Sequence, residues 1–184
     1  IFCTILVLGS DWLLFSLISM LSLNFDMLKC EIKEALNDPW IRLQAFKILI
    51  VRHNLLIDLS NQIESIFSSI LLYGFVQSSL VICFSGFHIV TAESLASVVL
   101  YGSRLCIALS QIYLTYNFGQ MLIDSSASLV NEGIYDSDWC MIKDLKIKKM
   151  LINFIQCSQR TKKLTAKGFK IISRETLMQA RFIL

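Results

Sequence analysis

The sequence predicts an all-α membrane protein, a polytopic bundle in which three helices cross the bilayer. Apolar residues make up 55% of the 184 residues and charged residues only 17%, whereas globular domains contain about 45–50% and about 25%. Three long stretches are nearly free of charge, and each reaches the roughly 20 residues that a spanning helix needs. A soluble domain of this size would need more charge to cover its surface.

The three expected spans cover residues 1–25, 65–84 and 95–119. The first carries one charged side chain, Asp11, the second carries none, and the third carries only Arg104. Helices are favoured over strands because a lipid-facing backbone must satisfy its hydrogen bonds within the segment. The chain begins inside an apolar run and stops inside a predicted helix, so we expect a piece of a longer membrane protein.

The Lys and Arg residues of the connections predict the orientation, because short basic connections stay in the cytoplasm. Residues 26–64 hold five Lys or Arg, residues 85–94 hold none, and residues 120–184 hold eleven. We therefore expect a cytoplasmic helical connection over 26–64 and a cytoplasmic region over 120–184. The basic tail fits this rule better than it fits nucleic-acid binding, since the net charge is only +3.

Both cytoplasmic regions carry helical patterns. Apolar residues recur every four positions from Leu28 to Leu36, until Pro39 ends the pattern. Residues 147–155 place their apolar side chains at the spacing of one helical face, which we expect to pack against protein. Ser173 is the expected N-cap of a further helix.

No motif of an enzyme is present: the sequence lacks a glycine-rich phosphate loop, a nucleophile elbow and a zinc-protease motif. The six cysteines form no CxxC pair, and the two histidines, His53 and His88, fall on opposite sides of the expected membrane. We therefore expect no catalytic site, no metal and no cofactor.

Asp11 and Arg104 stand out because ionisable groups inside spans are rare and often functional. Each lies about ten residues from the outer start of its span, so the two side chains could pair or line a water-filled cavity. The alternative is that Arg104 extends to the outer interface while Asp11 faces another helix. Both interpretations stay open at the level of sequence.

Four blocks of residues stand out along the chain. They are Asp11–Phe15 with the helix to Leu36, Arg52–Leu56 with Ile63–Ser68, Tyr116–Gly119 with Ser125, Ser126, Tyr135 and Trp139, and Leu164–Ala166 with Phe169 and Ser173–Glu175. Together they resemble the C-terminal half of an insect odorant receptor, and their order and spacing match over nearly the whole chain. The resemblance implies spans four to six and the start of span seven of a seven-helix receptor. Its orientation is opposite to that of a G-protein-coupled receptor and agrees with the distribution of Lys and Arg.

The resemblance also implies a function. Such a subunit binds small volatile apolar molecules and, with a shared coreceptor, forms a hetero-tetrameric odorant-gated cation channel in the plasma membrane of olfactory neurons, surrounded by lipid. By position it implies an odorant pocket built by Trp12, Phe15, Val98, Tyr101 and Leu105. It implies subunit or anchor contacts through the cytoplasmic residues His53, Tyr135, Trp139 and Phe169.

Two alternatives remain at this stage. A gustatory receptor is the nearest relative of the family, and its last membrane helix would distinguish it. Part of a transporter would carry inverted repeats or helices interrupted at mid-membrane. The single proline, Pro39, lies outside the spans, and no repeat is visible.

Overall fold

The computed structural model describes residues 2–37, 43–137, 139, 142, 144–158, 164–165, 167 and 172–181. Helices account for most of these residues, which confirms the expected all-α fold. The elements are α1 (Phe2–Asn37), α2 (Leu43–Val90), α3 (Leu95–Val130), the π-helix η1 (Asn131–Tyr135), α4 (Leu145–Ser158) and α5 (Arg174–Arg181). Phe169 and the expected break around Pro39 lie outside the described residues.

Three helices, α1, α2 and α3, are long enough and apolar enough to cross a membrane. They contain 36, 48 and 36 residues, which corresponds to lengths of about 54, 72 and 54 Å. The hydrocarbon core of a bilayer is only about 30 Å thick. Each helix therefore continues well beyond the bilayer.

The core of the bundle runs along one face of α1. Its buried apolar residues recur in steps of three and four, the spacing that keeps one helical stripe against a neighbouring helix. They are Leu14, Ile18, Leu21, Phe25, Leu28, Ile32 and Leu36. This stripe belongs to the same apolar cluster as buried residues of α2 and α3, so α1 packs against both of the other long helices.

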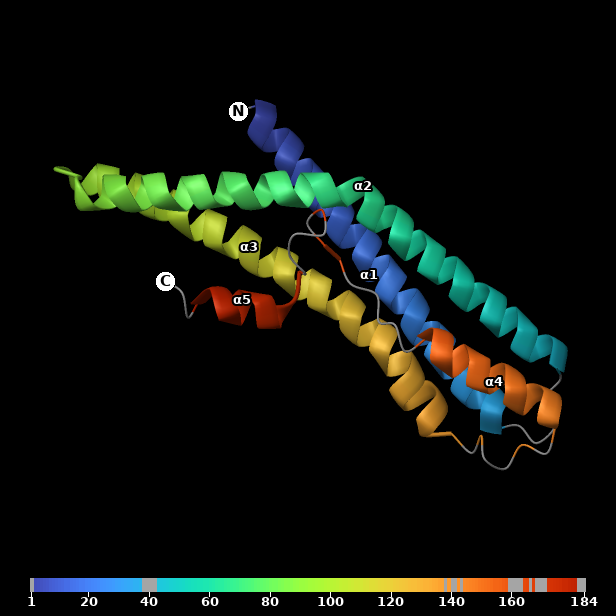
Figure 1. Ribbon diagram of the computed structural model, residues 1–184. Coiled ribbons are helices and arrows are strands. Elements are labelled where there is room, and N and C mark those ends of the chain that lie inside the picture. The colour runs from blue at the N-terminus through green and yellow to red at the C-terminus, as the bar shows by residue number, and fades with distance from the viewer. Residues whose placement is uncertain are drawn as a thin grey trace.

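The long helices separate at one end. The hairpin of α2 and α3 turns through residues 91–94 and points away from the N-terminal end of α1 (Figure 1). Ser94 caps α3 by accepting a hydrogen bond from the backbone N–H of Ser97 at 3.3 Å. We refer to this end of the bundle as the hairpin end, and to the opposite end as the α4 end.

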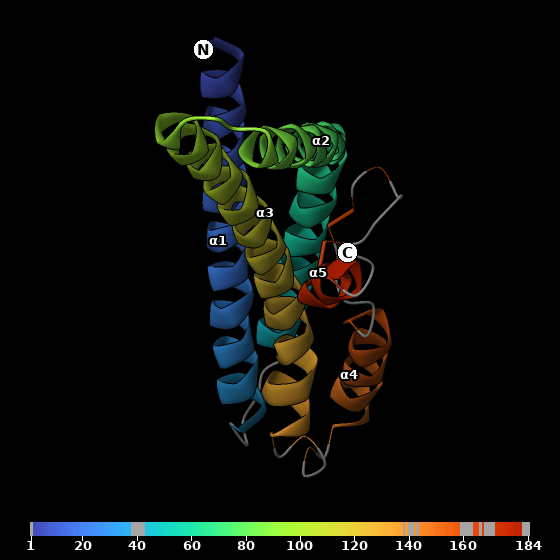
Figure 2. The ribbon, with the colours of Figure 1, turned by 90° about the vertical axis from the view of Figure 1, so that its left-hand side faces the viewer.

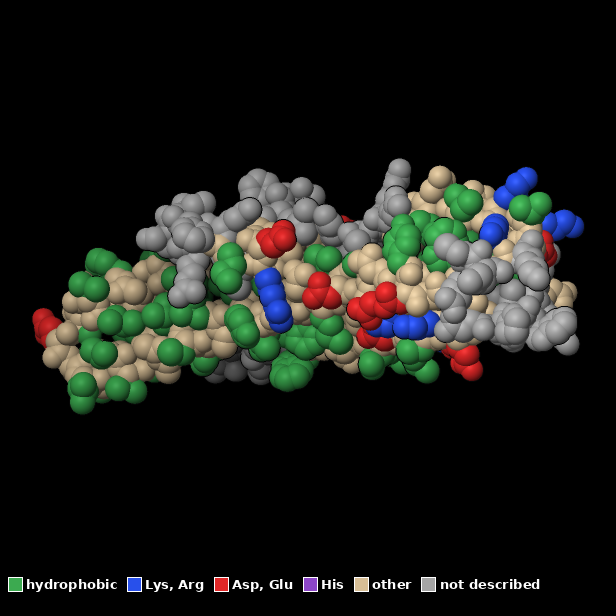
Figure 3. Space-filling model, turned by 90° about the horizontal axis from the view of Figure 1, so that it is seen from below, with side chains coloured by type: hydrophobic (Ala, Val, Ile, Leu, Met, Phe, Trp, Pro, Cys, Tyr) green, Lys and Arg blue, Asp and Glu red, His purple; other side chains and the backbone are tan. Residues whose placement is uncertain are grey.

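The α4 end carries α4 and the ion pairs that join the long helices and η1. α4 and α5 lie on the side of α3 that faces away from α1 (Figure 2). Arg52 of α2 donates to both carboxylate oxygens of Glu31 on α1 at 2.6 and 2.7 Å, and Lys29 binds Glu132 at 3.0 Å. On the face seen in Figure 3, charged side chains gather toward this end, and hydrophobic side chains dominate the hairpin end.

The expected packing face of α4 and the expected N-cap of α5 are both confirmed. Ile147, Leu151 and Phe154 of α4 are buried, and the ring of Phe154 meets that of Phe46 on α2 at 6.3 Å. The Ser173 hydroxyl accepts the N–H of Thr176 at 3.4 Å and so caps α5. The π-helix η1 was not expected. It lies beside α1, where a Cβ on Gly133 would come within 3.3 Å of Lys29.

Truncating Leu151 should destabilise the protein far more than truncating Leu145 in the same helix. Leu151 is 0% exposed and Leu145 is 73% exposed. Removing a buried leucine side chain leaves a cavity and costs about 2–5 kcal/mol of unfolding free energy. Thermal unfolding of the purified whole receptor in detergent should show a clear loss for Leu151→Ala and little change for Leu145→Ala. Equal effects would contradict this placement of α4.

Candidate ligand site where three helices meet

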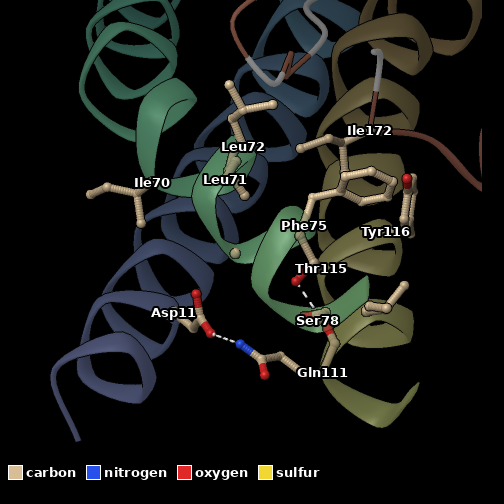
Figure 4. Close-up of a pocket in the computed structure, with 12 residues that line it drawn as sticks. Asp11, Ile70, Leu71, Leu72, Phe75, Ser78, Gln111, Thr115, Tyr116 and Ile172 are labelled. Carbon is tan, nitrogen blue, oxygen red and sulfur yellow. Dashed lines mark hydrogen bonds between the residues drawn. The ribbon is translucent and has the colours of Figure 1, made fainter. Parts of the chain in front are cut away.

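A cavity of about 60 Å³ lies where α1 meets α2 and α3 (Figure 4). Apolar side chains from α2 and α3 form most of its wall, and Ile172, from the segment that enters α5, closes part of it. The volume exceeds what a single water needs. The apolar lining residues are Ile70, Leu71, Leu72, Phe75, Ile112, Tyr116 and Ile172.

Polar atoms reach the cavity near the N-terminal part of α1. Gln111 of α3 donates a hydrogen bond from its side-chain amide to the Asp11 carboxylate of α1. Ser78 and Thr115 also line the cavity, and the Thr115 hydroxyl donates to the Gln111 carbonyl oxygen at 3.0 Å. An apolar wall with a few convergent polar groups is the usual composition of a site for a small organic molecule.

Asp11 and Arg104 lie in different surroundings. Arg104 is exposed and lines a separate groove of about 650 Å³ between α2 and α3, nearer the hairpin end. It precedes Gln111 by seven residues, about 10 Å along the helix axis. Among the described residues no ion pair joins Asp11 to Arg104, and Asp11 accepts its hydrogen bond from the uncharged Gln111. The Asp11 carboxylate is therefore hydrogen-bonded to the Gln111 amide and not paired with Arg104.

The structure spreads the five residues of the implied odorant pocket over two places, and none of the five lines the cavity. Phe15 is buried and stacks on Phe118 of α3 with ring centroids 4.5 Å apart, whereas Trp12 is 72% exposed. Tyr101 lies at the hairpin end, where it stacks on His88 of α2 at 4.5 Å. Val98 and Leu105 are half-buried on the same part of α3.

Three of the four implied anchor residues can be placed, and all three lie at the α4 end. His53 is buried between the rings of Phe25 and Phe154, and its Nε2 atom lies 3.3 Å from the Ser158 hydroxyl of α4. Tyr135 is exposed at the end of η1. Trp139 packs against the core cluster. His53 therefore joins α1, α2 and α4 inside the bundle, while Tyr135 faces outward.

Sequence reasoning missed Gln111 and Ile172 as site residues. Gln111 is uncharged and so did not attract the attention given to Asp11 and Arg104, although a polar amide inside a span was a usable signal. Ile172 lies outside every span, and only the three-dimensional path of the chain brings it to the cavity. Within the described residues, no group of three His, Cys, Asp or Glu side chains could hold a metal ion.

Comparison with known proteins gives consistent matches. Residues 1–180 match the model of the family described as 7tm Odorant receptor. The chain is similar to Odorant receptor 85b of Drosophila melanogaster, with 31% identity over 92% of this chain and 44% of the relative. It is also similar to Odorant receptor 85c of the same organism, with 30% identity over the same shares. The chain spans less than half the length of these relatives.

Chemical cross-linking should distinguish the two possible neighbours of Asp11. Cysteines placed at 11 and 111 in the whole receptor should be joined by a short bifunctional thiol reagent, because the parent side chains are hydrogen-bonded. Cysteines at 11 and 104 should react much less. A protease site inserted at residues 91–94 lets a denaturing gel report whether the two fragments stay linked. Preferential linkage of 11 to 104 would contradict the structure.

Proposed function

The chain belongs to the 7tm Odorant receptor family, and on that premise we propose that it is part of a receptor subunit that binds small volatile molecules and, with a coreceptor, forms an odorant-gated cation channel. The observation that carries this proposal is the family match over residues 1–180. The chain is a multi-pass membrane protein, with three helices long and apolar enough to span. The relatives that it resembles are named as receptors.

The proposed ligand site is the cavity between α1, α2 and α3. Its apolar wall, with Phe75, Tyr116 and Ile172, suits the hydrocarbon part of a small volatile molecule, and Asp11 and Gln111 offer hydrogen bonds to a polar end. We favour this cavity over the odorant pocket that the resemblance implies, which includes Trp12 and Tyr101. The residues that line the cavity face one another, whereas those of the implied pocket lie in two separate parts of the bundle.

The proposed orientation places the α4 end in the cytoplasm and the hairpin end outside. Lys29, Lys33, Lys47 and Arg52 all lie near the α4 end of α1 and α2, whereas residues 85–94 carry no Lys or Arg. Tyr135 is exposed there and available to a neighbouring subunit such as the coreceptor. The proposed location is the plasma membrane of olfactory sensory neurons.

The proposed function is tested by recording currents. The complete receptor, expressed with the coreceptor in oocytes under voltage clamp, should give cation currents to members of a volatile panel, and neither subunit alone should do so. Absence of current to every volatile, with both subunits shown at the cell surface, would contradict the proposal.

A bulky side chain at Gly74 should weaken the response to the volatile that gives the largest current. Gly74 lines the cavity, and a Cβ there meets no atom within 4 Å, so a phenylalanine ring enters the free space. Because each methylene of lost space costs about 1–3 kcal/mol, we expect Gly74→Phe to raise the half-maximal concentration by at least about tenfold.

Gly86→Phe is the matched control for this variant. Gly86 lies in the same helix and also has no atom within 4 Å of an added Cβ, but it does not line the cavity. Its response should stay within about twofold of the parent receptor, since it adds the same ring without filling the proposed site. Equal responses from both variants would place the ligand elsewhere.

A further inference from the structure

The segment that enters α5 forms part of the cavity wall. Ile172 is buried and lines the cavity, and it stands two residues before the first residue of α5. Its backbone N–H donates to the Leu164 carbonyl oxygen at 2.9 Å. Thr165, which follows Leu164 in the chain, donates a hydrogen bond from its hydroxyl to the Glu64 carboxylate of α2 at 2.5 Å. A displacement of Ile172 is therefore a displacement of the start of α5.

The first residue of α5 is fastened to α3 by two hydrogen bonds. Arg174 donates from Nε to the side-chain oxygen of Asn117 at 2.8 Å, and its backbone N–H donates to the side-chain oxygen of Gln120 at 3.1 Å. The amide of Gln120 is oriented for this by donating to Asp124 at 2.7 Å. Both hydrogen bonds of Arg174 are exposed to solvent, so breaking them costs little free energy.

Between these two contacts the backbone of Ile172 presses against Gly119. A Cβ on Gly119 would lie 2.5 Å from the Ile172 carbonyl oxygen and 2.7 Å from its Cγ2 atom. Only glycine permits this approach of α3 to the chain. Because the contact involves backbone atoms, Ile172 has no room to move toward α3, and any outward push from the cavity must shift the chain that leads into α5.

We propose that Asn117, Gly119 and Gln120 of α3, together with Ile172 and Arg174, form a clasp that holds α5 against α3 and releases it when a ligand occupies the cavity. This inference rests on the proposed function and concerns the regulation of the same site. A ligand that fits better when Ile172 is displaced binds the released state more tightly, and it shifts the equilibrium by that difference in affinity. Because Ile172 packs closely on Gly119, a small displacement of Ile172 moves α5 from the held arrangement to the released one.

The clasp joins two segments that lie far apart in the sequence. The block Tyr116–Gly119 supplies Asn117 and Gly119, and the block Ser173–Glu175 supplies Arg174. The two blocks lie more than fifty residues apart in the chain, as the separation of 57 residues between Asn117 and Arg174 records. The side chains of Asn117 and Arg174 meet only because α5 returns to α3 (Figure 1).

Two opposite substitutions at Asn117 test the clasp in the whole receptor expressed with the coreceptor. Asn117→Ala removes the acceptor of Arg174, so the ligand-independent current should rise and the half-maximal ligand concentration should fall, each by about three- to tenfold. Asn117→Asp replaces a neutral acceptor by a charged one, so both quantities should move in the opposite direction. General structural damage would move the two variants the same way.

Substitution of Gly119 provides a second test with a matched control. Gly119→Ala forces the Ile172 backbone away from α3 and should raise the ligand-independent current as Asn117→Ala does. Gly102→Ala, in the same helix, meets no atom within 4 Å and should leave that current unchanged. Surface labelling of each variant corrects the currents for the amount of protein. A normal current in Gly119→Ala would overturn the proposal.

Hydrogen exchange of the purified receptor–coreceptor complex, measured without ligand, separates failure of the clasp from failure of the receptor function. Backbone amides of residues 174–181 should exchange about three- to tenfold faster in Asn117→Ala than in the parent complex. If the parent complex answers volatiles but the Asn117 variants change neither current nor exchange, the clasp is wrong and the receptor function stands. If no volatile gives a current, the receptor function fails, and unchanged exchange would then reject the clasp as well.

Discussion

The contact of α1 with the other two long helices is the constraint on which the rest of the structure depends. The buried stripe from Leu14 to Leu36 keeps one face of α1 in the common core for most of its length. The cavity lies at the start of that stripe, beside Asp11. α4 and the ion pairs between the helices lie at its other end. A change in the angle between α1 and α3 would therefore alter the cavity and the α4 end at the same time.

The two ends of the bundle differ in what stabilises them. At the α4 end, Arg52 and Glu31, Lys29 and Glu132, and the ring contacts around His53 join α1, α2, η1 and α4. At the hairpin end, α2 and α3 leave α1 and expose apolar side chains, as a surface in lipid or against further helices would. Ion pairs and ring contacts therefore join several helices at the α4 end, whereas the hairpin end presents mainly apolar surface.

The sequence was sufficient for the fold class but not for the site. Charge-free length predicted three spanning helices, and helical spacing predicted the buried face of α4 at Ile147, Leu151 and Phe154, because both signals are local. The cavity depends on where α3 and α5 meet α1, which no local pattern encodes. Asp11 was singled out by its charge, yet its partner Gln111 carries none. The π-helix η1 was also missed, since a single extra residue in a helical turn leaves the hydrophobic period almost unchanged.

The central claim is that ligand occupies the cavity against Ile172 and so acts on α5. The most direct measurement is an electron cryo-microscopy structure of the complete receptor with its coreceptor, in the presence of the volatile that evokes the largest current. The account predicts ligand density in contact with Tyr116 and Ile172, together with a longer distance between Asn117 Oδ1 and Arg174 Nε than the 2.8 Å of the structure described above. Ligand density elsewhere, with the Asn117–Arg174 hydrogen bond intact, would contradict it.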